Sequence, residues 1–498
     1  MRVSSKTKNS KFFQPIDRVA LPLMLLLSVL IGILLGGGDR SMPYVRDFSW
    51  QDKQIGAADT FFILTFSRPM DHISVEANLH IEPPLPGLVS WAGRRLVYTL
   101  ATPAHYDTTY KVKLQKVRQS LGTGKLGNLM QPFAGQFRGR DRAFVYLGVE
   151  EEEKGRLILY NLTHKQKTIL TPKNWVVTDF KPYPDGDRIL FAASDWSNYG
   201  PGLFEQQLYT VTTGRSVISA SQANPTPKAG KINQVLDNLD YHNLKFDLSA
   251  DGQVIVVQRV NRQNLEDSGL WIVRPNTPWQ PLLNQQGGEF LITPDSATLA
   301  NTQGEGIAIL PLTPKAKPLD FLPKFSKVFN FARDGVQAAM VKLNSDATQS
   351  LFLVTNQGLQ KEILRPTGEF LDCEFDPKGQ NLYCLITQLL PEKEEAKQLT
   401  IAKIDLKTLK VAPLLVLPKQ WENIKMNLSP DGLALLFDQV ATKDGLPSRD
   451  ELTTDTGGAI ATSHLFLLPI VERRPESTTD FVPHQELPLR GFSPRWLP

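Results

Sequence analysis

The stretch MNLSPDGLAL at residues 426–435 sets a Pro-Asp-Gly turn between two short apolar runs. Asp-Gly flanked by alternating apolar residues is a strong local signal for a β-hairpin. Variants of this arrangement occur at five earlier places, and the six turns are Pro184–Gly186, Ala250–Gly252, Pro294–Ser296, Arg333–Gly335, Pro377–Gly379 and Pro430–Gly432. Six hairpins of one pattern predict an all-β repeat protein.

Apolar residues stand at fixed distances from these turns. Six positions before the last turn residue are Phe180, Phe246, Phe290, Phe329, Cys373 and Met426. Four positions before it are Pro182, Leu248, Ile292, Phe331, Phe375 and Leu428, and three positions after it are Ile189, Ile255, Leu299, Ala338, Leu382 and Leu435. Because residues two apart on a strand share a face, this spacing predicts one buried face that is repeated six times.

A second pair of strands follows each hairpin, as at Gln207–Val211, Gly269–Val273 and Leu351–Val354. A further copy, beginning near Ala143, has the later strands but lacks the first one. Four strands per unit, at a spacing of about 40–65 residues, are typical of β-propeller blades. The sequence therefore predicts a propeller over residues 142–498 with seven blades, and six or eight blades remain as alternatives.

The repeated unit resembles the blades of TolB-type propellers, which carry F-S-P-D-G-x-x-I-A-F followed by L-Y-x-x-D. The resemblance covers about 340 residues. It implies a fold and only loosely a function, since one fold hosts many functions. Gly491–Pro494 repeats the signature of the leading strand, so we expect this segment to complete the copy near Ala143. Arg490 departs from the pattern, because the other copies are mostly apolar there.

Residues 42–140 contain another series of short strands separated by turns. The predicted strands are Phe61–Phe66, Val75–Ile81, Leu88–Trp91, Leu96–Leu100, Tyr110–Leu114 and Phe133–Phe137. Such a series over about 100 residues predicts a β-sandwich. The stretch resembles the bacterial Ig-like module of surface-layer (SbsA-type) proteins at Ile63–Asp71, Trp91–Tyr98 and Thr108–Leu114. The resemblance implies a spacer or interaction domain rather than chemistry.

Gly122–Gly127 matches the pattern G-x-G-x-x-G. As a nucleotide-binding fingerprint this pattern needs a strand before it and a helix after it. Here it falls between two predicted strands of a β-domain, so a flexible turn is the favoured interpretation.

The N-terminal segment 19–38 is apolar and carries no charge over twenty residues. Twenty helical residues span roughly 30 Å, about the thickness of the hydrocarbon core of a bilayer. Residues 1–18 contain five Lys or Arg residues, so the positive-inside rule predicts a cytoplasmic tail, an uncleaved single-pass transmembrane helix and a periplasmic or lumenal bulk. A cleaved signal peptide is the alternative.

The charges of the chain are concentrated at its N-terminus. Residues 1–40 hold six basic and two acidic residues, which leaves equal numbers of basic and acidic residues in the remainder. A neutral bulk predicts no nucleic-acid partner, because such binding needs clustered Lys and Arg. The two cysteines, Cys373 and Cys384, would lie directly opposite if Lys378-Gly379 formed a two-residue turn and only diagonally otherwise. A disulfide between them and a pair of free buried thiols both remain open.

No pattern in the sequence indicates catalysis. The seven histidines form no His-x-x-x-His pair, and no Gly-x-Ser-x-Gly motif occurs. We therefore predict no catalytic residue, no cofactor-binding residue, no cofactor and no metal site. The aromatic residues Trp196, Tyr199 and Phe204 lie in one loop and are predicted to bind a partner, since loops on a rigid scaffold often carry binding. Loops that pack on themselves are the alternative.

These features favour a non-enzymatic, membrane-tethered propeller that acts as a protein-binding or assembly scaffold outside the cytoplasm. Two alternatives remain open: a hydrolase with a site in the central funnel that acts on glycan or peptide, and a structural protein of the cell envelope. A cluster of carboxylates lining the funnel would favour the hydrolase.

Overall fold

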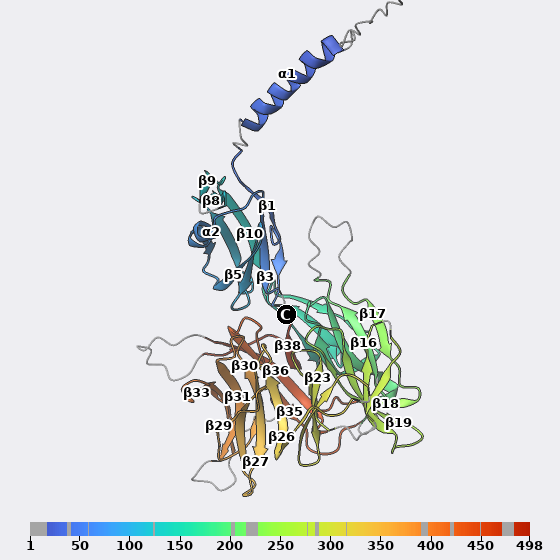
Figure 1. Cartoon of the computed structure of the whole chain (residues 1–498). Helices are drawn as coiled ribbons and strands as arrows, with labels where there is room; N and C mark the ends of the chain where they lie inside the picture. The colour runs from blue at the N-terminus through green and yellow to red at the C-terminus, as the bar shows by residue number, and fades with distance from the viewer. Residues whose placement is uncertain are drawn as a thin grey trace, which may run out of the picture.

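The structure is a computed structural model of the chain. It describes residues 17–36, 41–57, 59–122, 125–200, 205–215, 228–275, 277–283, 288–314, 316–389, 397–418, 423–448, 450–470 and 483–498. From the N-terminus these residues form a helix, a β-sandwich and a ring of β-sheets, which follow one another along the molecule (Figure 1).

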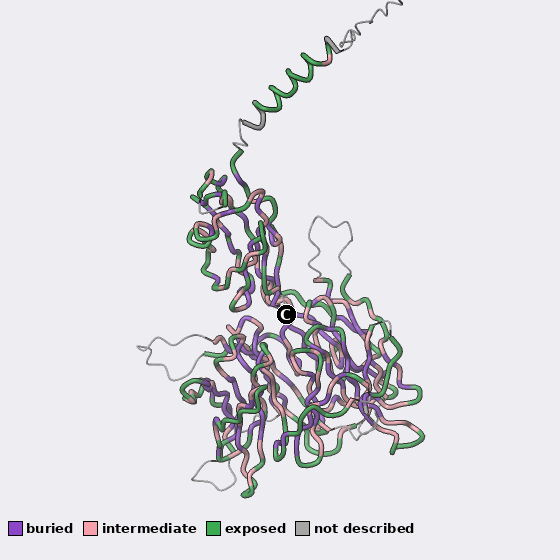
Figure 2. The backbone as a smooth tube through the Cα atoms, viewed as in Figure 1, coloured by how far each residue is buried: buried purple, intermediate pink, exposed green. Residues whose placement is uncertain are grey.

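Helix α1 (Asp17–Gly36) forms where the sequence predicted an apolar helix. Its large apolar side chains from Val19 to Ile31 are exposed to solvent, as the green tube in Figure 2 shows. Within the described ranges, no helix combines the length and the apolar character that crossing a membrane requires. The membrane-spanning segment at residues 19–38 stays a prediction, and its last two residues lie outside the described ranges.

Two sheets pack face to face to form the β-sandwich. One has the strand order β1 (Val45–Phe48), β3 (Phe61–Phe66), β6 (Arg95–Leu100), β5 (Gly87–Ala92), and the other β2 (Gln54–Ile55), β10 (Phe133–Gly139), β7 (Thr109–Leu114), β4 (Leu79–Glu82). Alternate residues of these strands point inward, so Phe62, Leu64 and Phe66 meet Tyr110, Val112 and Leu114 in one buried core. The predicted sandwich is thus present, and its kinship to Ig-like modules stays a prediction.

The prediction of a strand at Val75–Ile81 is wrong for its first half, which is helical. Helix α2 (His72–Asn78) precedes β4, and the carboxylate of Asp71 accepts a hydrogen bond from the backbone N–H of Ser74 at 3.0 Å. An Asp at this position satisfies one of the free N–H groups of the first helical turn. The helix cap at Asp71 therefore outweighs the β-branched residues that follow it.

The glycine-rich stretch Gly122–Gly127 lies in a small hairpin of β8 (Arg118–Ser120) and β9 (Leu126–Leu129). Gly122 has φ +81°, a left-handed conformation that glycine adopts without strain. No helix begins after it in the described residues of this hairpin, so the local structure is that of a turn.

The described residues from Ala143 onward form seven four-stranded antiparallel sheets. In the order of the chain, the first sheet comprises β11 (Ala143–Gly148), β12 (Leu157–Asn161), β13 (Gln166–Ile169) and, beside β11, β38 (Gly491–Trp496). The second comprises β14 (Trp175–Pro182), β15 (Arg188–Asp195), β16 (Gln207–Thr212) and β17 (Ile232–Leu236), and the third β18 (Tyr241–Leu248), β19 (Ile255–Asn261), β20 (Ser268–Val273) and β21 (Gln280–Leu283).

The remaining four sheets have the same meander order. The fourth comprises β22 (Phe290–Ile292), β23 (Thr298–Gln303), β24 (Gly306–Pro311) and β25 (Asp320–Pro323), and the fifth β26 (Phe325–Phe331), β27 (Gln337–Leu343), β28 (Gln349–Thr355) and β29 (Gln360–Leu364). The sixth comprises β30 (Phe370–Phe375), β31 (Asn381–Leu389), β32 (Lys397–Asp405) and β33 (Val411–Val416), and the seventh β34 (Met426–Leu428), β35 (Ala434–Thr442), β36 (Ile460–Pro469) and β37 (Gln485–Glu486).

The six predicted hairpins share one register. The residue four positions before the last turn residue pairs with the residue three after it in every copy, from Pro182↔Ile189 to Leu428↔Leu435. The last turn residue has a positive φ in all six, including Ser296 at +58° where the others have glycine. The N–H of this residue donates to the carbonyl three positions earlier, so the turn has four residues rather than the tight two-residue form.

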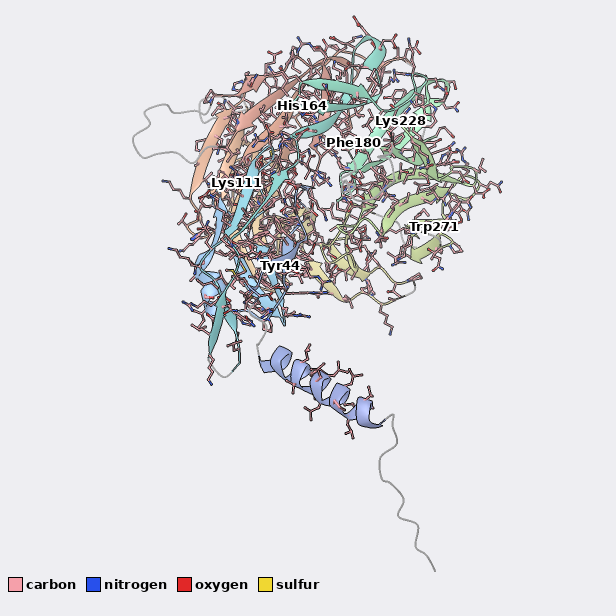
Figure 3. All side chains as sticks on the ribbon, turned by 90° about the horizontal axis from the view of Figure 1, so that it is seen from above. Tyr44, Lys111, His164, Phe180, Lys228 and Trp271 are labelled. Carbon is pink, nitrogen blue, oxygen red and sulfur yellow. A yellow bond between two sulfur atoms is a disulfide. The ribbon has the colours of Figure 1, made fainter. Side chains whose placement is uncertain are left out.

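Apolar clusters join each sheet to the next around a closed ring. The first and second sheets share a core that contains Phe180 and Phe191, and successive clusters link the later sheets in the same way. The seventh sheet then packs on the first through Leu436, Phe144 and Trp496. Figure 3 shows the sheets from above, with Phe180 of β14 nearer the middle than Trp271 of β20. This is the architecture of a β-propeller.

The last strand closes the ring as predicted. β38 pairs antiparallel with β11, with Phe144 opposite Trp496 and Leu147 opposite Phe492, and so supplies the strand that the first copy lacks. The backbone N–H of Leu497 continues the pairing by donating to the carbonyl of Ala143 at 2.9 Å.

The sandwich contacts the propeller near the C-terminus (Figure 1). The hydroxyl of Tyr106 donates to the carbonyl of Leu497 at 3.3 Å, and the guanidinium of Arg333 donates to the carbonyl of Ala57. Arg140, after the last sandwich strand, donates to the carbonyl of Asp185. Burial raises the pKa of Tyr106 far above its ordinary value, which keeps this hydroxyl neutral and able to donate.

Candidate functional site: the axial polar ring

One edge strand of each sheet faces the middle of the propeller. These strands are β38, β14, β18, β22, β26, β30 and β34, and they contact one another from sheet to sheet, whereas the opposite edge strands lie at the periphery. Phe180, Phe246, Cys373 and Met426 point sideways into the cores between sheets. The residues on either side of them therefore point to the opposite face of their sheet, and these residues are polar or charged.

We define the axial polar ring as the polar side chains of these strands that reach a neighbouring sheet. Arg495 pairs with Asp179 at 3.1 Å, and Lys181 pairs with Asp247. The other oxygen of Asp247 accepts from the backbone N–H of Ile292 at 2.7 Å. In this way the first four sheets are joined in sequence.

The ring continues on the other side of the propeller. The carboxylate of Glu374 accepts from the backbone N–H of Leu428 at 2.8 Å and from the Asn427 amide at 3.1 Å. Asn427 in turn accepts from the backbone N–H of Trp496 at 2.7 Å, while the Trp496 indole donates to the Asn427 carbonyl at 3.1 Å. The sixth, seventh and first sheets are therefore also joined by polar side chains of their inner strands.

These polar links between sheets change in the fourth and fifth sheets. The position that holds Asp247 or Glu374 elsewhere is occupied by the apolar Leu291 in β22. In β26 it is occupied by Asn330, whose side chain accepts from the N–H of Phe331 in its own strand. Among the described residues, the side chains at these two positions make no hydrogen bond to a neighbouring sheet.

Asp438 secures the closing strand from inside the protein. It is fully buried on β35, and its two oxygens accept backbone N–H groups of Lys425 and Ser493, each at 2.6 Å. Burial raises the pKa of Asp438 to about 7, against the lowering effect of these two amides.

Two carboxyl groups of β30 lie close together at the axis. Burial raises the pKa of Asp372, and burial together with the charge of Asp372 raises the pKa of Glu374 to about 7. A carboxyl group with such a pKa holds a proton near neutral pH, which is the state a general acid requires. The axis therefore has groups that are able to transfer protons, although Glu374 also serves as a link between sheets.

The structure places the predicted loop residues in a packed position. Trp196 and Tyr199 are half-buried and contact an apolar cluster with Val176, Val440 and Leu452, on the second and seventh sheets. The Tyr199 hydroxyl accepts from the backbone N–H of Thr453 at 3.1 Å. These two aromatics therefore tie their loop to the seventh sheet, and Phe204 lies outside the described residues.

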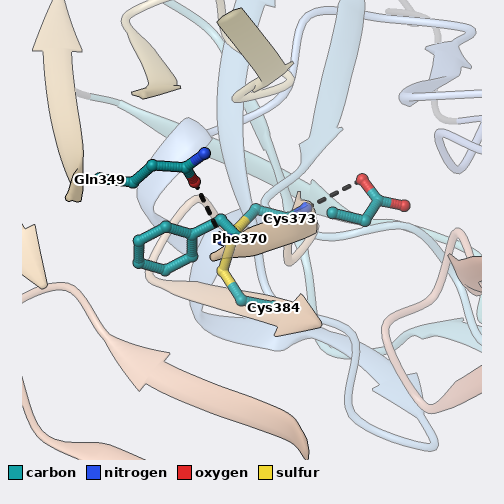
Figure 4. Close-up of a disulfide and its surroundings, with 5 residues drawn as sticks. Gln349, Phe370, Cys373 and Cys384 are labelled. Carbon is teal, nitrogen blue, oxygen red and sulfur yellow. Dashed lines mark hydrogen bonds between the residues drawn. A yellow bond between two sulfur atoms is a disulfide. The ribbon is translucent and has the colours of Figure 1, made fainter. Parts of the chain in front are cut away.

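Cys373 and Cys384 lie directly opposite each other on β30 and β31. The expectation that only a two-residue turn would place them so was wrong, because the longer turn is centred on the same Lys378-Gly379 bond and keeps the same register. Their Cα atoms are 4.1 Å apart and their sulfur atoms are bonded, as Figure 4 shows. The backbone N–H of Cys373 donates to the Asp372 carboxylate at 2.9 Å, so the disulfide lies next to the axial carboxyl pair.

The residues of the axial polar ring were missed in the sequence, although a signal existed. They occupy the position directly after the core residue of each hairpin, which reads Lys181, Asp247, Leu291, Asn330, Glu374 and Asn427. Polar residues recur there, but nothing in the sequence shows that they meet at one axis.

No family model and no curated protein sequence matches the chain. Among solved structures it is similar to an oligogalacturonate lyase from Vibrio parahaemolyticus, with 10% identity, 60% of this chain and 87% of that one covered, and a TM-score of 0.40. It is similar to TolB from Acinetobacter baumannii, with 11% identity, coverage of 65% and 77%, and a TM-score of 0.35. A putative 6-phosphogluconolactonase from Bacteroides fragilis gives 12% identity, coverage of 72% and 98%, and a TM-score of 0.39. The propeller architecture stands on the strand pairing and the ring of cores, which do not depend on these likenesses.

Proposed function

We propose that this protein is a non-enzymatic scaffold that binds protein partners on its propeller, outside the cytoplasm. The observation that carries the proposal is the axial polar ring, whose side chains form hydrogen bonds and ion pairs with the next sheet. Such links make the propeller a rigid frame, and a rigid frame is what a binding surface needs in order to lose little entropy on association.

Two features support the part of this proposal that places the protein outside the cytoplasm. A disulfide such as Cys373–Cys384 persists in oxidising compartments. The basic residues 1–18 and the uncharged run 19–38 favour an N-terminal membrane tether, with the sandwich, which we take to be Ig-like, as a spacer and the propeller as a seven-bladed head. A reporter that is active only in the cytoplasm, fused after Pro498, should be silent, and activity of that fusion would refute this orientation.

The binding role is tested by affinity recovery from solubilised membranes with the whole chain as bait. We expect one or a few proteins to be recovered in stoichiometric amounts, and crosslinking should map them to the propeller. Trp196→Ala and Tyr199→Ala variants show whether the loop that contains these residues contributes to binding beyond its packing. Recovery that is equal for the folded and the heat-denatured bait would refute the scaffold function.

The raised pKa of Glu374 favours a second candidate function. With this group the axis would act as the site of a hydrolase for glycan or peptide, in which the protonated carboxyl group serves as the acid. The test is turnover of glycan and peptide libraries by the purified chain, with Glu374→Gln as the comparison. Turnover that this substitution abolishes in a folded protein would establish the enzyme and overturn the scaffold as the main function.

A further inference from the structure

A groove of about 450 Å³ lies between the fourth and fifth sheets, where the axial polar ring lacks its polar links. We call it the boundary groove. One wall comes from the turn at Pro294-Asp295 with β24 and β25, and the other from the turn at Arg333–Gly335 with β27 and β28. Its volume falls in the range of about 300–1,000 Å³ that is usual for sites that bind a ligand.

The floor of the boundary groove is apolar. It is formed by the side chains Ile309, Leu322, Phe331, Met340 and Val354. Val336 stands at its rim with 40% of its surface exposed. Leu322, Met340 and Val354 also belong to the core between these two sheets, so the floor of the groove is one side of that core.

The charge at the rim is predominantly negative. Asp295, Asp320 and Asp334 line the boundary groove, against the single cation Arg333, whose guanidinium donates to the sandwich carbonyl of Ala57. One oxygen of each aspartate accepts a backbone N–H of its own turn or strand, and these bonds fix the three carboxylates in place. For Asp295, burial raises the pKa, but hydrogen bonds from Thr293, Ala297 and Thr298 outweigh it and lower the pKa, so this carboxylate stays ionised.

A second, smaller pocket continues from the boundary groove. It has a volume of about 260 Å³, lies between the sandwich and the propeller, and is lined by Leu100–Pro103 on one side and Pro377–Gly379 on the other. Arg333 and Asp334 line both spaces. A chain segment that leaves the boundary groove at this turn therefore enters the space at the domain junction.

We propose that the boundary groove binds an extended peptide segment of a partner protein, with one large apolar side chain flanked by Lys or Arg. The apolar floor takes the anchor side chain, and the three aspartates attract the flanking cations. The inference rests on the proposed scaffold function and names the chemistry of its partner.

The test is fluorescence anisotropy with the purified whole chain and blocked, labelled hexapeptides. The probe has a lysine–leucine–lysine centre, and two comparison peptides carry glutamate in place of lysine or serine in place of leucine. We expect saturable binding of the first peptide alone, and the affinity should fall as salt is added, because exposed charges are screened.

The protein variants are chosen to keep the fold. Asp334→Asn and Asp320→Asn retain the oxygen that accepts the backbone N–H, and together they should weaken binding about tenfold through the loss of two charges. Val336→Arg places a cation at the rim and should abolish binding. Asp251→Asn is the matched control, since Asp251 holds the same turn position in the third sheet and does not line the boundary groove. Its affinity should equal that of the wild type.

Three results would overturn the proposal: stronger binding of the glutamate peptide, equal affinity in the Asp320/Asp334 double variant, or self-association of the chain that Val336→Arg abolishes, which would assign the groove to a second copy. The same Val336→Arg variant separates this inference from the scaffold function. If it recovers the membrane partner as well as the wild type does, the groove is the wrong surface and the scaffold stands. If no bait recovers a partner, the scaffold function fails.

Discussion

Two boundaries of the propeller differ in how they are filled. Between the seventh and first sheets, the large side chains Phe144, Tyr146 and Trp496 fill the core, and Asn427 links the backbones. Between the fourth and fifth sheets, the core includes Leu322, Phe325 and Met340, and the boundary groove remains open beside it. The first sheet also has to hold together β11 and β38, which come from opposite ends of the propeller sequence, whereas the fourth and fifth sheets are each built from consecutive strands.

The difference lies in how the sheets are assembled. Residues 487–490 connect β37 of the seventh sheet to β38 of the first, but no neighbouring segment of the chain connects β38 to β11. These two strands are held by their hydrogen-bond ladder and by the aromatic side chains at the boundary of the seventh and first sheets, which we call the closing boundary. The fourth and fifth sheets need no such closure, so we expect the largest losses of stability from changes at the closing boundary and binding at the other.

Deleting residues 487–498 should have the largest effect on stability. It removes β38 and leaves both β11 and the core around Phe144 uncovered. Loss of a buried aromatic side chain alone costs about 3–5 kcal/mol, and here a whole strand is lost as well. The variant should fail to unfold cooperatively in a thermal melt. A melting temperature within a few degrees of the wild type would contradict the special role of the closing boundary.

Removing the disulfide should have a smaller effect. Cys373 and Cys384 are 11 residues apart on one hairpin of the sixth sheet, between the two boundaries. A cross-link of such a short loop contributes about 2–3 kcal/mol. Urea unfolding of the Cys373→Ser/Cys384→Ser protein should show this loss in a single transition. Thiol labelling of the unfolded, unreduced wild type is the control, and two reactive thiols there would mean that no bond exists.

Asp438 should make the closing boundary sensitive to pH. Its folded-state pKa of about 7 lies above its ordinary value of 3.8, so the folded protein binds this proton more tightly than the unfolded chain does. The resulting stabilisation is complete below about pH 4 and is lost as the pH rises through about 7. The wild type should therefore become less stable between pH 5 and pH 8.

The Asp438→Asn variant tests this assignment. It keeps one acceptor and loses the other, which should cost about 1–3 kcal/mol at pH 5, and less at pH 8 where the wild type carries a buried charge. Urea unfolding at both pH values measures the difference, with the exposed Asp444→Asn as control. A variant with the same pH dependence as the wild type would show that Asp438 is not the responsible group.

The Tyr199 hydroxyl should contribute least. Its bond with the Thr453 N–H joins the loops of the second and seventh sheets outside the ring of cores. Tyr199→Phe keeps the aromatic packing and should lower stability by about 1 kcal/mol or less. Hydrogen exchange at Thr453 should become faster while amides at the closing boundary remain unchanged. Faster exchange at both places would mean that this loop supports the ring itself.

The fold was predictable because its signals are local. Each hairpin carries its own turn, and the offsets of Phe180 or Leu435 from that turn mark one buried face. Even the closing strand was predictable, since Gly491–Pro494 repeats the local pattern of the other leading strands. The helix at His72–Asn78 was not predicted, because its cap at Asp71 competes with a β-branched sequence that is equally local.

The candidate sites were not predictable, because they depend on distant residues that meet. Glu374 and Asp438 come from different sheets, and their raised pKa values arise from burial in the assembled propeller, which the sequence does not show. The boundary groove is lined by the turns at Pro294 and Arg333 and by strands of two sheets. Its walls lie about 40 residues apart in the sequence, and nothing in either segment shows that they enclose a space.

The position of β11 also determines how the molecule carries mechanical load. β11 follows directly from the last strand of the sandwich and lies inside its sheet, with β12 on one side and β38 on the other. A pull between the sandwich and the propeller therefore enters at a strand that is bonded along both edges. Two hydrogen-bond ladders share the force, and neither can be opened from a free edge of β11. β38, which completes the ring, thus also holds β11, the strand at which a pull from the sandwich reaches the propeller.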